Sequence, residues 1–466
     1  MKKMQRIIGM LLLCSVAIGL FSCGKIKDPL ADMDNITNNW MPILSEEECL
    51  ATMGLGNSKD TLPIISRARS NNYGNCIYYC QYDLVPADED EPNTNMTLVR
   101  TFMRYDLRNG ESYPVCRDSA CLHNSESCPL YAGCIEWHII VDDTIYMLWA
   151  DINKTGEVNT KRKGYICSYN LETLEFKRIC ERDAGVYNFM TYHDGKIYYV
   201  QYEYPDETNK HEKYLWSCDV KTGKTQKLFQ YGSEKDNAYQ GRAPLMVDEK
   251  GRMLFMNFVS FDANARKESV IVFEYAELKK GAEIVEVVEY TGYFERASYD
   301  TLQYSNGRLY FSALQEEIPY THLWNGEERE ATMLRDAIVY VDMNTGEVGK
   351  LPNDAIFGFA IAGDYLYYFP YDPKLYDYEN EFGKQQVMAT TNGTVIQRNL
   401  KTGEEKVFPI KGNYDFVSST TYYYRGRLFT YGTDMSGYNV WSGSMEIDLI
   451  SGEVREIDAQ VLREGP

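Results

Sequence analysis

Short apolar and aromatic segments follow a tight turn seven times along the chain. The seven stretches read GNCIYY, DDTIYM, DGKIYY, KGRMLF, NGRLYF, GDYLYY and RGRLFT. Their equivalent positions are Tyr78, Tyr146, Tyr198, Leu254, Tyr310, Tyr367 and Phe429, and subtraction gives intervals of 68, 52, 56, 56, 57 and 62 residues. A turn that leads into an apolar and aromatic run is typical of a hairpin, so each stretch predicts a β-strand.

A second kind of turn follows each of these strands. The seven turns read DLRNG, NLETLE, DVKTG, YAELKKG, DMNTG, NLKTG and DLISG. We expect the Asp or Asn to bond to its own turn and the Gly to adopt a positive φ. NLETLE lacks the Gly, and YAELKKG is longer and lacks the Asp.

Strands of period two, repeated in units of about 50 to 70 residues with hardly any helical pattern, predict an all-β fold, a β-propeller. Each unit would supply one four-stranded blade. We predict seven blades over residues 61–466, with six or eight as the alternatives.

The first residues predict export and a lipid anchor. MKKMQR carries three positive charges before the apolar run IIGMLLLCSVAIGLF, which is short for a membrane span and indicates a signal peptide. The order Leu20, Phe21, Ser22, Cys23 resembles the lipobox of bacterial lipoproteins. This resemblance implies a signal peptide over 1–22, lipidation of Cys23 and an extracytoplasmic location on a bacterial membrane. The alternative is an ordinary secretory signal with a chance cysteine.

We expect residues 23–60 to form a lipidated tether with one short helix, because Ser45 and Glu48 match a capping box.

The net charge of the chain argues against one class of partner. The net charge of -20 becomes -23 when Lys2, Lys3 and Arg6 leave with the signal. Because clustered Lys and Arg are needed to neutralise phosphates, we expect no nucleic-acid partner.

The turn and strand rhythm of DGKIYY resembles the TolB-like and YWTD-like propellers, especially those of bacterial surface lipoproteins without a defined activity. The resemblance covers residues 61–466 and rests on structural motifs. It therefore implies the fold and leaves the function open.

Long connections between the second and third strands of two blades contain aromatic residues beside carboxylates. The candidate ligand-binding residues are Tyr320, His322 and Trp324 in one connection and Tyr371, Tyr376 and Tyr378 in the other. Aromatic rings that stack, next to carboxylates that accept hydroxyl protons, suit a glycan or a peptide. The alternative is that these rings only hold their own loops in place.

A cysteine-rich connection joins the first two predicted blades. It contains Cys116, Cys121, His123, Cys128 and Cys134. These residues could form disulfides, bind a structural zinc or remain reduced thiols. We favour disulfides over zinc because the lipobox places the loop outside the cytoplasm and the spacings differ from the common Cys-x2-Cys pairs.

No motif indicates a reaction. The chain has no Gly-x-Ser-x-Gly elbow, and none of its five histidines has a recognisable acid-base setting, so we assign no catalytic residue and favour a non-enzyme. The first hypothesis is a lipid-anchored binding propeller for a glycan or peptide. The alternatives are a carbohydrate-active or other hydrolytic propeller that uses carboxylates on the long-loop face, and a docking scaffold of the cell envelope.

Overall fold

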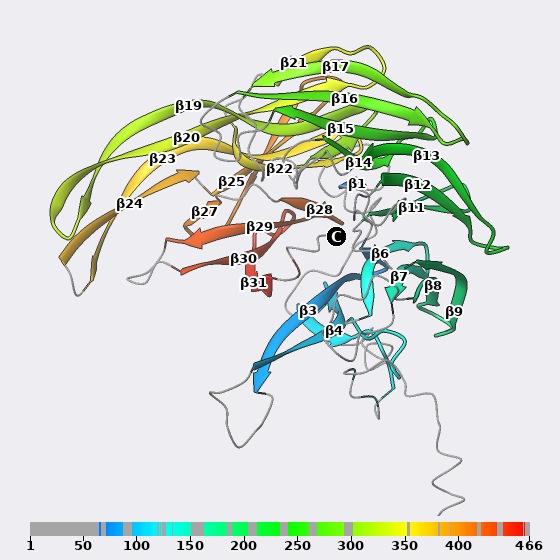
Figure 1. The fold of residues 1–466 in the computed structure, drawn as a ribbon. Coiled ribbons are helices and arrows are strands. Elements are labelled where there is room, and N and C mark those ends of the chain that lie inside the picture. Colours follow the sequence, from blue (N-terminus) through cyan, green and yellow to red (C-terminus); the bar gives the residue numbers. More distant parts are fainter. Residues whose placement is uncertain are drawn as a thin grey trace, which may run out of the picture.

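The computed structural model confirms a β-propeller of seven blades (Figure 1). It describes residues 65–66 and residues 71–461 with gaps at 87–95, 119–120, 122, 124–126, 133, 151–162, 184–188, 204–211, 234–240, 261–267, 293–301, 352–354, 381–382, 392, 417–420, 436–440 and 460. The predicted signal peptide, Cys23 and the tether lie outside the described residues. Within those residues, no helix has the length and apolar character to cross a membrane.

Four blades are regular antiparallel sheets of four consecutive strands. Blade one consists of β2 (Asn72–Tyr73), β3 (Cys76–Pro86), β4 (Met96–Asp106) and β5 (Glu111–Pro114). Blade two consists of β6 (Ile135–Val141), β7 (Thr144–Ala150), β8 (Lys163–Asn170) and β9 (Phe176–Asp183). Blade three consists of β10 (Met190–His193), β11 (Lys196–Glu203), β12 (Glu212–Asp219) and β13 (Thr225–Ser233). Blade four consists of β14 (Gly241–Val247), β15 (Arg252–Ser260), β16 (Ser269–Glu277) and β17 (Ile284–Gly292).

The other three blades carry an additional strand. Blade five consists of β18 (Gln303–Ser305), β19 (Arg308–Trp324), β20 (Glu327–Asp342) and β21 (Val348–Lys350), with β1 (Ile65–Ser66) paired to β18. Blade six consists of β22 (Ala355–Ala362), β23 (Tyr365–Asn380), β25 (Thr394–Asn399) and β26 (Glu405–Pro409), with β24 (Gly383–Thr391) paired to β23. Blade seven consists of β27 (Tyr414–Phe416), β28 (Tyr422–Tyr424), β29 (Arg427–Asp434), β30 (Trp441–Asp448) and β31 (Val454–Ile457).

The turn between the third and fourth strands has the predicted chemistry. In blade three, the Asp219 carboxylate accepts hydrogen bonds from the backbone N–H groups of Lys221 and Thr222, and Gly223 has φ 68°. In five other blades the equivalent side chain also accepts a hydrogen bond from a backbone N–H of its turn. These side chains are Asp106, Asn170, Asp342, Asn399 and Asp448. Where NLETLE lacks the glycine, Leu174 adopts φ 62°. The motif therefore fixes the shape of the turn, even where a leucine must occupy a left-handed conformation.

A backbone hydrogen bond joins the two turns of each of these blades. The apolar residue after the Asp or Asn donates its N–H to a carbonyl in the turn between the first two strands. In blade two, for example, Leu171 bonds to the Asp143 carbonyl at 2.7 Å. Equivalent bonds are Leu107 to Asn75, Val220 to Gly195, Met343 to Gly307, Leu400 to Asp364 and Leu449 to Gly426. Both kinds of short turn therefore lie on the same face of the propeller.

The core lies between neighbouring blades. Buried apolar clusters bridge blades one and two, two and three, three to five, five and six, six and seven, and seven and one. Between blades six and seven, the rings of Tyr367 and Tyr423 stack with centroids 4.6 Å apart. Because each buried large apolar side chain stabilises the fold by about 1.5–3 kcal/mol, these contacts hold the ring together.

Side chains close the ring between blades one and seven. Each of the two blades is built from its own consecutive strands, and no described strand passes from one to the other. The Tyr105 hydroxyl of blade one donates to Glu446 of blade seven at 2.5 Å, and Arg455 donates to the Leu107 carbonyl at 2.9 Å. Closure therefore depends on a buried polar network together with an apolar cluster.

Candidate functional site

Features that recur in the blades serve the fold, and features confined to one or two blades are candidates for function. Three places are candidates on this basis. They are a groove between blades two and three, an extended pair of hairpins on blades five and six, and the cysteine-rich connection after blade one.

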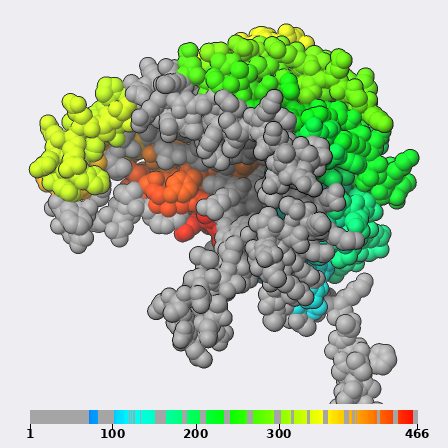
Figure 2. Space-filling view, viewed as in Figure 1, coloured from blue at the N-terminus to red at the C-terminus, as the bar shows by residue number. Residues whose placement is uncertain are grey.

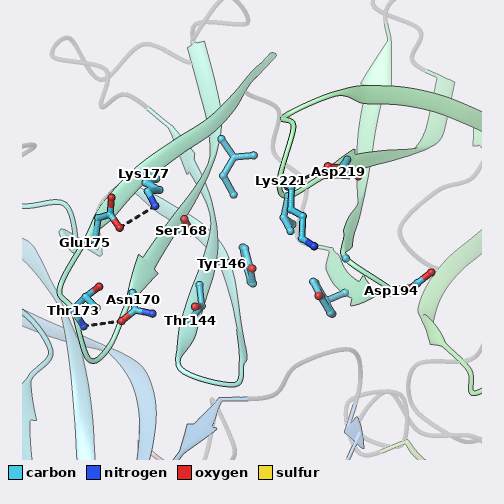
Figure 3. A pocket seen from close by; sticks show the side chains of 14 residues that line it. Thr144, Tyr146, Ser168, Asn170, Thr173, Glu175, Lys177, Asp194, Asp219 and Lys221 are labelled. Carbon is cyan, nitrogen blue, oxygen red and sulfur yellow. Dashed lines mark hydrogen bonds and ion pairs between the residues drawn. The ribbon is translucent and has the colours of Figure 1, made fainter.

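The groove lies on the short-turn face and has a volume of about 730 Å³ (Figure 3). Tyr146 of β7 and Tyr192 of β10 line it, and their rings stack with centroids 5.7 Å apart. Burial, followed by the neighbouring Tyr192, raises the pKa of Tyr146 above its ordinary value. The two phenols thus form one aromatic contact across the blade boundary.

Most polar groups of the groove belong to the repeated turns. Asn170 and Asp219 are turn-capping residues, and Asn170 also donates to Asp143 at 2.8 Å. Hydrogen bonds from Thr222 hold the pKa of Asp219 below its usual value. Lys177 and Glu175 pair with each other at 2.9 Å (Figure 3). Because these lining residues are the turn-capping residues that recur in other blades, the groove follows from the repeated fold and is not a candidate for function.

The extended hairpins correct one expectation from the sequence. We expected the segments around Tyr320 and Tyr376 to be long loops, whereas they are strands. β19 has 17 residues and β20 has 16, and they pair from Arg308 opposite Asp342 to Trp324 opposite Glu327. β23 extends in the same way and pairs with β24. Figure 1 shows both hairpins projecting on the same side of the ring.

Hydrogen bonds join the ends of the two hairpins. The Gly326 N–H donates to the Lys384 carbonyl at 2.8 Å. The Gln385 side chain accepts from the Asn325 N–H at 3.0 Å and donates to the Asn325 side chain at 2.6 Å. The Gln386 side chain accepts from the Leu323 N–H at 3.1 Å. We call the joined outer halves, residues 314–336 and 371–391, the hairpin pair. Its tips hold each other in one geometry.

The hairpin pair contains all six aromatic and histidine residues that the sequence singled out. The rings of Tyr320 and His322 lie 5.5 Å apart on one face of β19, and Trp324 is 45% exposed at the tip. Tyr371, Tyr376 and Tyr378 lie on β23, paired with Thr391, Val387 and Gln385 of β24. Two segments about 50 residues apart in sequence are therefore neighbours in the structure. In the space-filling view, the yellow-green outer part of β19 and β20 lies at the left edge of the molecule (Figure 2).

The carboxylates expected beside these aromatic residues include three glutamates at the tip that were not named from the sequence. Glu327, Glu328 and Glu330 follow the turn, and their side chains are exposed. Asn325 and Gly326 have φ 53° and 77°. Asn-Gly with two positive φ values is the strongest short hairpin signal, and it could have revealed both the strands and this acidic tip.

The cysteine-rich connection gathers four of its five candidate residues around one point. The ligand atoms of Cys116, Cys121, His123 and Cys128 all lie within 4.8 Å of one another. The first three residues are half-buried and Cys128 is buried. Such a set of three thiols and one imidazole can coordinate a soft divalent metal.

Cys134 is not part of this group. It is 1% exposed, belongs to the apolar cluster between blades one and two, and its carbonyl accepts a hydrogen bond from Ala150 at 2.9 Å. No disulfide joins two of the described cysteines, and the disulfide assignment stays a prediction. In this connection, three sulfur atoms and one imidazole surround a common point.

Comparisons with known proteins identify no family. No protein-family model matches the chain, and no curated protein matches it. Among solved structures, the acylaminoacyl peptidase of Pyrococcus horikoshii has 11% identity and a TM-score of 0.44, covering 84% of this chain and 51% of that one. The chain thus spans about half the length of that peptidase.

Two further solved structures resemble the chain over most of their own length. The β-propeller domain of the Trilobed protease from Pyrococcus furiosus has 11% identity and a TM-score of 0.41, covering 84% of this chain and 95% of that one. The oligogalacturonate lyase from Vibrio parahaemolyticus has 10% identity and a TM-score of 0.33, covering 77% and 95%. Similarity at this level says nothing about activity.

Proposed function

We propose that this protein is a lipid-anchored, extracytoplasmic binding propeller, and that the hairpin pair binds its ligand, a glycan or a peptide. The observation that carries the proposal is the set of hydrogen bonds that joins the tips of the long hairpins of blades five and six. In the described residues, the second strand of the hairpin is 17 residues long in β19 and 16 in β23, against 11 in β3, 7 in β7, 8 in β11, 9 in β15 and 8 in β29. Extra strand length that the ring does not need is therefore available for recognition.

The surface chemistry of the hairpin pair supports this proposal. Trp324 and Leu375 are 45% and 42% exposed, although both are large apolar side chains. Indole presents an apolar face and a polar N–H, which suits a sugar ring or an aromatic or proline side chain. Because the joined tips are already ordered, the protein would lose less conformational entropy when a ligand binds.

The charge at the tip narrows the ligand class. Glu327, Glu328 and Glu330 are exposed beside Trp324, with Arg329 as the cation among them. Like charges placed opposite each other reduce affinity, so we expect neutral glycans or basic peptides to bind and acidic ones to be rejected.

Replacing Trp324 by alanine is expected to weaken binding by about tenfold or more, as removal of an aromatic anchor does at other interfaces. The measurement is a glycan array and a peptide array, followed by titration calorimetry on each hit. The matched control is Tyr431→Ala, which removes a comparably exposed aromatic residue (39%) from blade seven and is expected to leave the affinity unchanged. Equal losses in both variants, or no hit on either array, would contradict a binding role for the hairpin pair.

The anchor can be tested separately from the ligand. Replacing Cys23 by serine is expected to abolish incorporation of a radiolabelled fatty acid and to release the chain from the membrane fraction, because only a thiol can be lipidated in this way. Cys14→Ser changes a cysteine within the segment 1–22 and is expected to leave both readouts unchanged. If the Cys23→Ser chain still carries label, the lipid lies elsewhere.

A further inference from the structure

We infer that Cys116, Cys121, His123 and Cys128 form a structural zinc site that fastens the connection between blades one and two. A tetrahedral zinc has Zn–S bonds of about 2.3 Å and Zn–N bonds of about 2.0–2.1 Å, which place its ligand atoms about 3.6–3.8 Å apart. The four ligand atoms lie within 4.8 Å of one another, and Cys128 Sγ is 3.8 Å from His123 Nδ1. Only small side-chain movements therefore separate this arrangement from tetrahedral coordination.

The backbone of the connection already directs these side chains to one point. The Cys121 N–H donates to the Asp118 carbonyl at 3.1 Å and closes a turn. His123 then adopts φ 54°, and its N–H donates to Cys121 Sγ at 3.4 Å. A backbone N–H directed at a ligand sulfur stabilises the thiolate form, as the groups around metal ligands generally do. A left-handed histidine is costly unless its surroundings require it.

The ligand set indicates a closed structural site. Three sulfurs and one nitrogen fill the four positions that zinc prefers in structural sites, whereas catalytic sites leave one position for water or substrate. One disulfide would use two of the three thiols and leave the third beside the imidazole without a function. Zinc uses all four residues and keeps the thiolates from oxidation.

The position of the site explains what the metal would do. The second half of the connection is held by backbone contacts, because Thr101 pairs with Tyr131 and Ala150 bonds to the Cys134 carbonyl. In the first half, the Arg117 side chain donates a hydrogen bond to the Leu171 carbonyl of blade two at 3.2 Å. Zinc would link Cys116, which follows the end of strand β5, to Cys128, which is buried in the core between blades one and two.

The test is metal analysis of the full chain purified without oxygen and without added metal. We expect about one zinc per chain, and after exchange we expect the charge-transfer and d–d bands of tetrahedral thiolate-bound cobalt. A chelator should lower the melting temperature, and zinc should restore it. These three readouts use the unaltered protein, so they do not depend on whether a variant folds.

Two variants locate the metal. Cys121→Ser is expected to reduce zinc to below about a tenth of the wild-type content and to remove the response to the chelator. Cys134→Ala alters a buried cysteine of the same connection that lies outside the group, and it should retain the metal. A chain without zinc after reconstitution, iron or copper in its place, or a disulfide between any two of Cys116, Cys121 and Cys128 by mass spectrometry would overturn the proposal.

Discussion

Replacing Glu446 by glutamine is expected to lower the free energy of unfolding by about 3–5 kcal/mol, because it removes the anion from a buried ionic network. Glu446 is 0% exposed and lies on β30 of blade seven. Its carboxylate is 2.7 Å from Arg427 Nε and 2.5 Å from an Arg455 guanidinium nitrogen, and it accepts the hydrogen bond from Tyr105. Glutamine preserves the shape but leaves the two guanidinium groups facing a neutral amide.

The effect should appear at the junction of blades one and seven, where no strand among the described residues is shared between the two blades. Burial, and then the charge of Glu446, raises the pKa of Tyr105 well above its usual value, so the phenol remains a donor at physiological pH. Tyr105→Phe removes one hydrogen bond to a charged group and should cost about 1.5–3 kcal/mol. Chemical denaturation of each variant, followed by tryptophan fluorescence, measures these differences.

An exposed ion pair between the β30–β31 turn of blade seven and the connection that precedes β27 provides the control. Lys411 and Glu453 lie 2.6 Å apart, with side chains 61% and 50% exposed. Glu453→Gln should therefore change stability by less than about 1 kcal/mol. If Glu446→Gln also changes the free energy of unfolding by less than about 1 kcal/mol, the apolar cluster between blades one and seven closes the ring, and the ionic network does not.

The fold was predictable from the sequence because its two turn motifs are repeated along the chain. Seven turns of one kind and seven of another leave few topologies open, and the structure has seven blades. The closure of the ring was not predictable in this way. Tyr105 and Glu446 are 341 residues apart, and nothing near either residue indicates its partner.

The candidate residues illustrate the same limit. Their identities were visible in the sequence, but the geometry that joins them was not. The alternation of Tyr320, His322 and Trp324 before Asn325-Gly326 was a hairpin signal, which the polar composition of the segment obscured. Which hairpin it would contact depends on Gln385, 60 residues away.

The cysteine-rich connection was assigned five ligand or disulfide candidates, and the structure gathers four. Sequence spacing alone could not exclude Cys134 as a ligand, because Cys134 is kept apart from the other four residues by its burial in the core. The apolar residues Leu130 and Ala132 draw the second half of the connection into the core, and Cys134 goes with them. The turn that begins at Asp118 holds Cys121 outside the core.

The turn glycines also have a role that the sequence motif alone does not show. Gly223 lies against blade two, and a Cβ at this position would be 2.4 Å from the Ile179 carbonyl oxygen. The same relation recurs for Gly452 and the Pro409 carbonyl oxygen at 2.6 Å. Gly281 has a similar φ of 69°, but nothing lies within 4 Å of its added Cβ. An added methyl group would therefore meet the preceding blade at Gly223 and Gly452, and open space at Gly281.

Gly223→Ala is accordingly expected to lower the free energy of unfolding by about 2–5 kcal/mol. The left-handed backbone contributes about 1–2 kcal/mol, and displacement of the Ile179 backbone adds about 1–3 kcal/mol. Gly281→Ala bears only the first cost, so the difference between the two variants measures the blade contact. Denaturant titrations of both variants under identical conditions give that difference. Equal losses would mean that blade two yields to the added methyl group, and that the glycine is required only for the shape of its turn.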